Sequence, residues 1–126
     1  IIMKISPHVS IYKFPITALS SITTRITGVA LTGVFIGSGF FCLLPNKHQD
    51  NIQSTYKSFP QYVKNGINYI GLFPLCYHSL GGIRHLIWDK YPDFLTNIKV
   101  ARSSQMLLGS SLLLTYSAEK ILKKVI

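Results

Sequence analysis

Three long uncharged runs, separated by polar segments, dominate the pattern of this chain of 126 residues. The first covers residues 26–44 and, as a helix rising about 1.5 Å per residue, would extend about 28 Å, close to the roughly 30 Å of a bilayer core. The second covers residues 66–83 and contains Pro74, which a membrane helix tolerates as a kink when neighbouring groups satisfy the freed carbonyl. The third covers residues 103–118. The pattern predicts an all-α membrane protein with three transmembrane helices.

Prolines and charged residues set the expected bounds. The expected elements of one domain, residues 1–126, are a segment at the membrane interface at 1–19 and helices at about 20–45, 61–88 and 103–124. The polar segment after Pro45, which includes His48, is interpreted as a solvated loop. Glycines in the first run would let another helix or a cofactor approach the backbone closely. These are Gly28, Gly33, Gly37 and Gly39.

Composition favours a membrane environment and argues against a nucleic-acid partner. The chain is 48% hydrophobic and 13% charged, and the charged fraction is about half of that in a typical soluble domain. The net charge is +9, but the basic residues do not form the clusters of a nucleic-acid binder. Three crossings would place Arg25 and Arg84 on the same membrane face as the amino terminus. Lys and Arg divide almost evenly between the two faces, so their distribution does not assign a compartment.

Several candidate functional residues lie close together at the end of the second run. On a helix, His78 and His85 share one face with Gly81 and Gly82, where a flat group has room near the backbone. His78 lies about 9 Å deeper than Arg84 along the helix axis, at a depth where an ionisable side chain is costly unless it is paired. Three roles compete for His78: a structural hydrogen bond, a proton relay, and an axial ligand of heme iron.

The spacing of the two histidines limits the heme alternative. His78 and His85 lie roughly 10 Å apart on one side of a helix, so they cannot bind one iron from opposite faces. A six-coordinate heme would therefore take its second ligand from another chain.

Ser21 and Arg25 form an i, i+4 pair at the start of the first helix. Both are hydrogen-bond donors suited to the carbonyl oxygens of a quinone and to the charge that builds on reduction. By itself Arg25 is equally suited to a heme propionate or a lipid phosphate. The pair shares a membrane face with Arg84, which favours a shared site.

Three segments together resemble the large cytochrome b membrane-anchor subunit of succinate dehydrogenase, respiratory complex II. They are Ser-Pro-His-Val-Ser-Ile-Tyr-Lys at residues 6–13, Ser-Ile-Thr-Thr-Arg-Ile-Thr-Gly at 21–28, and His-Ser-Leu-Gly-Gly-Ile-Arg-His-Leu-Ile-Trp-Asp at 78–89. The pattern His-x-x-x-Gly-Ile-Arg-His-x-x-x-Asp is the specific part.

The resemblance implies roles for individual residues. His78 would be an axial ligand of the iron of heme b, which is shared with a small membrane-anchor subunit. Arg84 and His85 would lie near the heme propionates. A ubiquinone pocket, completed by the iron–sulfur subunit and the small anchor, would be lined by Ser21, Ile22 and Arg25.

The resemblance also implies an assembly. FAD and the iron–sulfur clusters would belong to the flavoprotein and iron–sulfur subunits. The chain would help to pass electrons from succinate to ubiquinone without catalysing a reaction alone, in contact with membrane lipid. Its location would be the mitochondrial inner membrane, as a multi-pass protein, or alternatively a bacterial plasma membrane.

The chain departs from the family pattern at two positions. Thr24 occupies a position where the family usually has a histidine that commonly contacts a heme propionate, and Tyr91 one where it often has glycine. Two other functions remain alternatives: a structural anchor that has lost heme, and a small proton-conducting membrane protein that uses His78.

Overall fold

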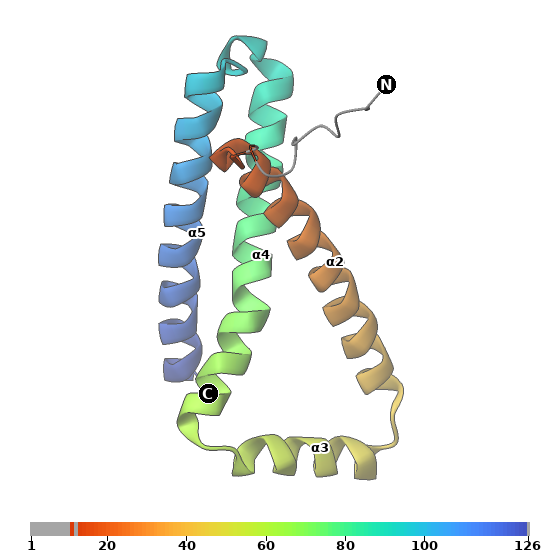
Figure 1. Cartoon of the computed structure of the whole chain (residues 1–126). Coiled ribbons are helices and arrows are strands. Elements are labelled where there is room, and N and C mark those ends of the chain that lie inside the picture. Colours follow the sequence, from red (N-terminus) through yellow and green to blue (C-terminus); the bar gives the residue numbers. More distant parts are fainter. Residues whose placement is uncertain (1–10, 12, 126) are drawn as a thin grey trace, which may run out of the picture.

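All of the regular secondary structure in the part of the chain described by the computed structural model, residues 11 and 13–125, is helical. The elements are α2 (Ile16–Leu43), α3 (Asn46–Ser58), α4 (Gln61–Lys90), the short 3₁₀ helix η1 (Pro92–Phe94) and α5 (Asn97–Val125) (Figure 1). The all-α prediction is therefore confirmed. Most of the expected interfacial segment and of the motif at residues 6–13 lies outside the described residues.

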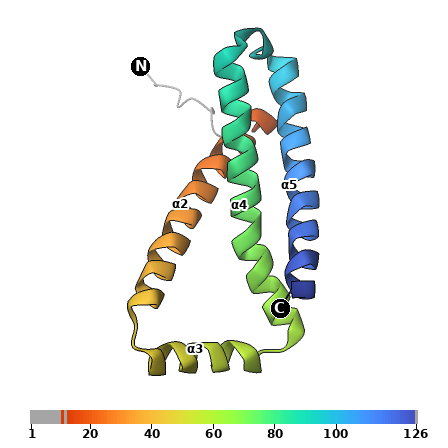
Figure 2. The ribbon, with the colours of Figure 1, turned by 180° about the vertical axis from the view of Figure 1, so that it is seen from behind.

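Helices α4 and α5 form a hairpin, and α2, α3 and α4 form the three sides of a triangle. The long helices α4 and α5 lie side by side, joined by η1, and α2 crosses both near its amino-terminal end (Figures 1 and 2). From this crossing α2 diverges from α4, and α3 connects their distant ends, as both views show. The helices thus meet where α2 begins, which is the region that positions the candidate site.

Three prolines precede the helices. The carbonyls of Pro15, Pro45 and Pro60 accept the first helical hydrogen bonds, from Ala18, His48 and Val63 at 2.9–3.0 Å. Proline is tolerated at a helix start because the first turn leaves its amide positions without intrahelical partners.

The expectation of a loop after Pro45 was wrong, because the segment that Pro45 and Pro60 enclose is the helix α3. His48 is nevertheless exposed on it, as expected. The third long helix begins at Asn97 rather than near residue 103, because the polar residues before Ser103 continue the helix instead of forming part of the turn.

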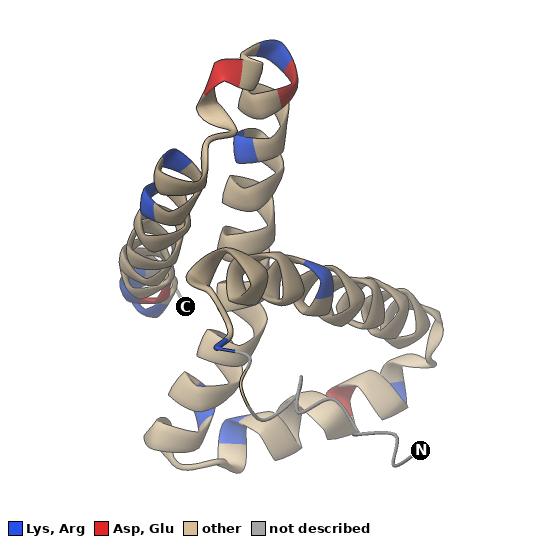
Figure 3. Cartoon of the chain, turned by 45° about the horizontal axis from the view of Figure 1, so that its top comes forward, with Lys and Arg blue, Asp and Glu red and all other residues tan. Residues whose placement is uncertain are grey.

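The membrane crossings are only partly supported by length and apolar character. Within the described part of the chain, α2 alone is both long enough and apolar enough to cross a membrane by composition. The long helices α4 and α5 carry more polar residues, including a row of serines on α5. Charged residues concentrate around the α4–α5 connection, along α3 and near the end of α5 (Figure 3).

The few buried side chains are mostly polar. Tyr77 and Leu107 are the buried apolar residues of the described part. The buried polar residues are Ser20, Thr27, Ser104, Ser111, Thr115 and Glu119. Large apolar residues, by contrast, are exposed along α2, α4 and α5. This distribution is the inverse of that in a soluble protein, whose interior is built from Leu, Ile, Val and Phe.

Candidate functional site

His78 extends from α4 to the backbone of α2. Its Nδ1 lies 3.0 Å from the carbonyl oxygen of Thr24. A carbonyl only accepts hydrogen bonds, so Nδ1 is the donor in this contact, and in a neutral imidazole the lone pair is then on Nε2. Metal-binding histidines commonly have this arrangement, with one ring nitrogen donating to a carbonyl and the other free to bind the metal.

Gly28 gives the His78 ring its place against α2. A Cβ at position 28 would lie 2.8 Å from Cε1 of His78, so the ring occupies the space of the missing side chain. Gly81 is buried, and a Cβ there would be in ordinary contact with Thr24, at 3.4 Å from its Oγ1. Gly82 is exposed with open space around it. Of the two glycines expected to make room, only Gly81 lies at a helix contact.

Arg84 joins three helices. Its Nη1 donates to Ser104 Oγ on α5 at 3.0 Å, and its Nη2 donates to Ser20 Oγ on α2 at 3.1 Å. The guanidinium lies over the ring of Trp88, 4.5 Å from the centroid. The buried Tyr77 adds a further bond, with its hydroxyl 3.2 Å from Ser20 Oγ. A polar node therefore fixes the crossing of α2, α4 and α5.

A small hollow lies beside this node. Its volume is about 100 Å³. Its lining is Ile16, Leu19, Ser20, Thr23, Tyr77, Ser104 and Leu108. The sequence does not mark Ser20, Tyr77 or Ser104 as site residues, because serines and tyrosines are frequent in this chain and only the packing determines which of them face inward.

The three expected quinone residues lie on the first turns of α2. Ser21 is half-buried, whereas Ile22 and Arg25 are exposed. Within the described part of the chain, neither Ser21 nor Arg25 has a side-chain hydrogen bond to another residue.

His85 lies apart from His78. It is exposed, and its ring meets Trp88 edge-on with centroids 5.2 Å apart. The described residues contain no group of three or more His, Cys, Asp or Glu side chains that could hold a metal ion.

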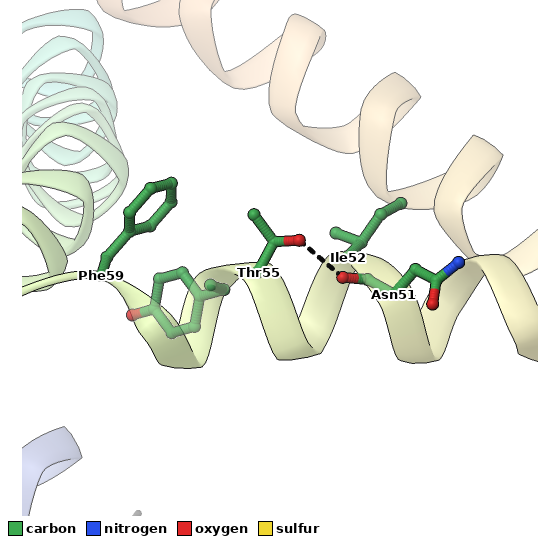
Figure 4. Close-up of a pocket in the computed structure, with 5 residues that line it drawn as sticks. Asn51, Ile52, Thr55 and Phe59 are labelled. Carbon is green, nitrogen blue, oxygen red and sulfur yellow. Dashed lines mark hydrogen bonds between the residues drawn. The ribbon is translucent and has the colours of Figure 1, made fainter.

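A second hollow lies away from these residues, on α3. It measures about 310 Å³ and is lined by Asn51, Ile52, Thr55, Tyr56 and Phe59. Ile52, Thr55 and Phe59 point from α3 toward the space between α2 and α4 (Figure 4). None of the expected site residues lines it.

An all-helical chain with an apolar helix of spanning length and a histidine held between helices has the character of a helical membrane-anchor protein. Residues 2–118 match the family of the succinate dehydrogenase/fumarate reductase transmembrane subunit. The chain belongs to this family, which confirms the resemblance seen in the sequence.

Individual relatives agree with this assignment. The chain is 35% identical over 105 residues to the mitochondrial succinate dehydrogenase cytochrome b560 subunit of Dictyostelium discoideum, a match that covers 82% of this chain and 54% of that protein. It is 30% identical over 116 residues to the succinate dehydrogenase cytochrome b556 subunit of Paracoccus denitrificans, covering 87% and 84%. The chain thus spans about half the length of the Dictyostelium relative, and likewise 52% of the mouse cytochrome b560 subunit.

Proposed function

We propose that the chain is a membrane-anchor subunit of a succinate:quinone oxidoreductase that supplies one heme ligand and part of a ubiquinone site. The relatives are named as cytochrome b subunits of succinate dehydrogenase, and the hydrogen bond from His78 to the carbonyl of Thr24 is the observation that carries the proposal.

Three membrane crossings, by α2, α4 and α5, are part of the proposal. Although α4 and α5 are less apolar than α2, the buried face of α5 is polar, with Ser104, Ser111 and Thr115 turned inward. Its exposed side chains include Leu108, Leu112, Leu113 and Leu114. An apolar outer surface around a polar interior is favourable in hydrocarbon, where polar groups need partners inside the protein.

His78 fits an axial ligand of heme b. With Nδ1 as the donor to Thr24, the neutral imidazole has its lone pair on Nε2, and the bond to α2 restrains the orientation of the ring. A bound heme would supply a one-electron redox centre. The second ligand would come from a small membrane-anchor subunit, because His85 lies on the same helix and faces Trp88.

Ser21, Ile22 and Arg25 fit one side of a quinone site. Ser21 would donate a hydrogen bond to a carbonyl oxygen of ubiquinone, and Arg25 would stabilise the negative charge that develops on reduction. Ile22 offers an exposed apolar surface to the ring. The exposure of Ile22 and Arg25 is consistent with a pocket completed by an iron–sulfur subunit and a small anchor.

The remaining cofactors would belong to partner chains, FAD to a flavoprotein subunit and the clusters to the iron–sulfur subunit. Arg84 and His85 would lie toward the heme propionates. The complex would reside in the mitochondrial inner membrane, or in a bacterial plasma membrane. Alone, the chain would not catalyse succinate oxidation.

The reduced-minus-oxidised absorbance spectrum of the purified complex tests this function. We expect a b-type signal that His78→Ala abolishes and that His48→Ala, a change at an exposed histidine of α3, leaves intact. A complex without any b-type signal would indicate a structural anchor that has lost heme. Proton flux through liposomes containing this chain alone, without quinone-dependent electron transfer, would indicate a proton conductor.

A further inference from the structure

Arg84 is held by hydroxyl groups of two neighbouring helices. Ser104 Oγ on α5 accepts from Nη1, and Ser20 Oγ on α2 accepts from Nη2. No carboxylate of the described residues lies within ion-pair distance of the guanidinium. The arrangement is therefore a bridge between helices, in which each terminal nitrogen of the guanidinium binds a serine of a different helix.

The bridge holds one face of α2. Ser20 Oγ also accepts a hydrogen bond from the hydroxyl of Tyr77. One turn further along α2, the carbonyl of Thr24 accepts a hydrogen bond from Nδ1 of His78. Thr24 Oγ1 in turn donates to the carbonyl of Ser20 at 2.9 Å, so the two residues form one connected row. Three side chains of α4 thus bind a single face of α2 over about one turn.

Ser21 and Arg25, the two residues proposed to bind quinone, each follow directly after a residue of α2 that is bonded to α4. Ser21 and Arg25 are each one position, or about 100° of helix rotation, beyond Ser20 and Thr24. A rotation of α2 about its axis would therefore swing Ser21 and Arg25 by the same angle. The bonds to Ser20 and Thr24 oppose such a rotation because they attach to the side of the helix and not to its end.

We propose that Arg84 is a positioning residue that sets the direction in which Ser21 and Arg25 face a quinone. The inference rests on the quinone role proposed above for this pair. It adds to the role proposed for Arg84 beside a heme propionate, because each terminal nitrogen uses only one of its two hydrogens on a serine. The remaining nitrogen, Nε, is buried and has no hydrogen-bond partner among the residues that the structure describes.

Quinone kinetics of the assembled complex in membranes test the proposal. Ser20→Ala removes the α2 end of the bridge and leaves the arginine charge in place, whereas Arg84→Lys keeps the charge but replaces the two terminal nitrogens that bind the serines by a single one. We expect each variant to lower kcat/KM for ubiquinone on the order of tenfold, mainly through KM, since small misplacements of binding groups are costly. Succinate oxidation by an artificial dye and the b-type spectrum should not change.

A double variant separates positioning from general destabilisation. Because Ser20→Ala and Arg84→Lys break the same bond, their effects on kcat/KM should be clearly less than additive when combined. Matched controls are Ser38→Ala on α2 and Ser110→Ala on α5, two exposed serines that bond only within their own helices. Both should keep wild-type quinone kinetics.

Each outcome has a defined meaning. Unchanged quinone kinetics in assembled Ser20→Ala would overturn the positioning role, and so would an Arg84→Lys complex with normal kinetics. If Arg84→Lys does not assemble, Ser20→Ala alone decides. Arg25→Ala tests the quinone site itself: normal quinone kinetics in that variant would refute the proposed function, whereas impairment there together with normal Ser20→Ala kinetics would refute only the role of Arg84.

Discussion

His78 packs so closely on Gly28 that a methyl group at position 28 would lie 2.8 Å from Cε1 of the imidazole. Contacts this short between carbon atoms are repulsive, so either the ring or the helix must move if a side chain is added. The ring is also held by its bond to Thr24. The absence of a side chain at Gly28 therefore allows His78 of α4 to pack against the backbone of α2.

Gly28→Ala should displace His78 and reduce heme retention. We expect the b-type absorbance per complex to fall severalfold, because the ring loses both its position and its bond to Thr24. Gly33→Ala is the matched control on the same helix, since a Cβ there would meet nothing within 4 Å. Equal heme content in the two variants would contradict this account of Gly28.

Gly81→Val should weaken the crossing of α2 over α4. A Cβ at position 81 would already touch Thr24 at 3.4 Å, so the two extra methyl groups of valine would overpack the contact at a cost of about 1–3 kcal/mol. The yield of assembled complex and its thermal midpoint in detergent measure this cost. Gly82→Val, at an exposed position with open space around it, should behave like the wild type within this chain's own fold.

Tyr77→Phe should destabilise the polar node without creating a cavity. The hydroxyl of Tyr77 is buried against Ser20, with distances of 3.2 Å to Oγ and 3.3 Å to the carbonyl oxygen. Its loss should cost about 1 kcal/mol, the usual net value of such a bond. The temperature at which half of the heme absorbance disappears should fall by a few degrees in Tyr77→Phe and remain unchanged in Tyr62→Phe, where the ring is 75% exposed.

The stability of the fold should depend on the ion pair between the carboxylate of Glu119 and Lys123. Glu119 is buried on α5, and Lys123 Nζ lies 2.6 Å from its Oε1, an ion pair without hydrogen-bond geometry. Lys123→Ala would leave the charge without its partner, which typically costs about 3–5 kcal/mol when both groups are desolvated and less here, because Lys123 is 40% exposed.

A double variant tests this pairing. Glu119→Gln combined with Lys123→Ala should recover most of the thermal stability lost in Lys123→Ala, because it removes the buried charge as well. Lys124→Ala, a change at an exposed neighbouring lysine, is the control. A double variant that is no more stable than Lys123→Ala would show that the charge of Glu119 is not the cause of the loss.

The helices could be predicted where the sequence pattern is local. The apolar run from residue 26 to residue 44 is contained almost entirely in α2, and the second long helix begins at Gln61, as expected. By contrast, α3 was missed because a polar segment between two prolines resembles a loop unless the prolines are recognised as helix starts. The start of α5 was placed too late for a similar reason, since charge was taken as a sign of a turn.

The site could be predicted only in part because its partners depend on helix packing. His78 was selected from its depth in an apolar run, but its bond goes to the backbone of Thr24, and a carbonyl has no sequence signal. Ser20 and Ser104 are two serines among many, and only the crossing of three helices brings them to Arg84. The roles of Ser21, Ile22, Arg25 and His85 toward quinone and heme stay predictions.

The divergence of α2 from α4 makes this helix a lever. It is held between Ser20 and Gly28, while Gly33, Gly37 and Gly39 meet no other part of the described chain. The free arm from residue 29 to Leu43 is about 22 Å long, so a tilt of roughly five degrees at the held end would move Leu43 by about 2 Å. A neighbouring subunit that binds the distant end of α2 and tilts the helix would thereby also shift the turn that carries Ser21 and Arg25.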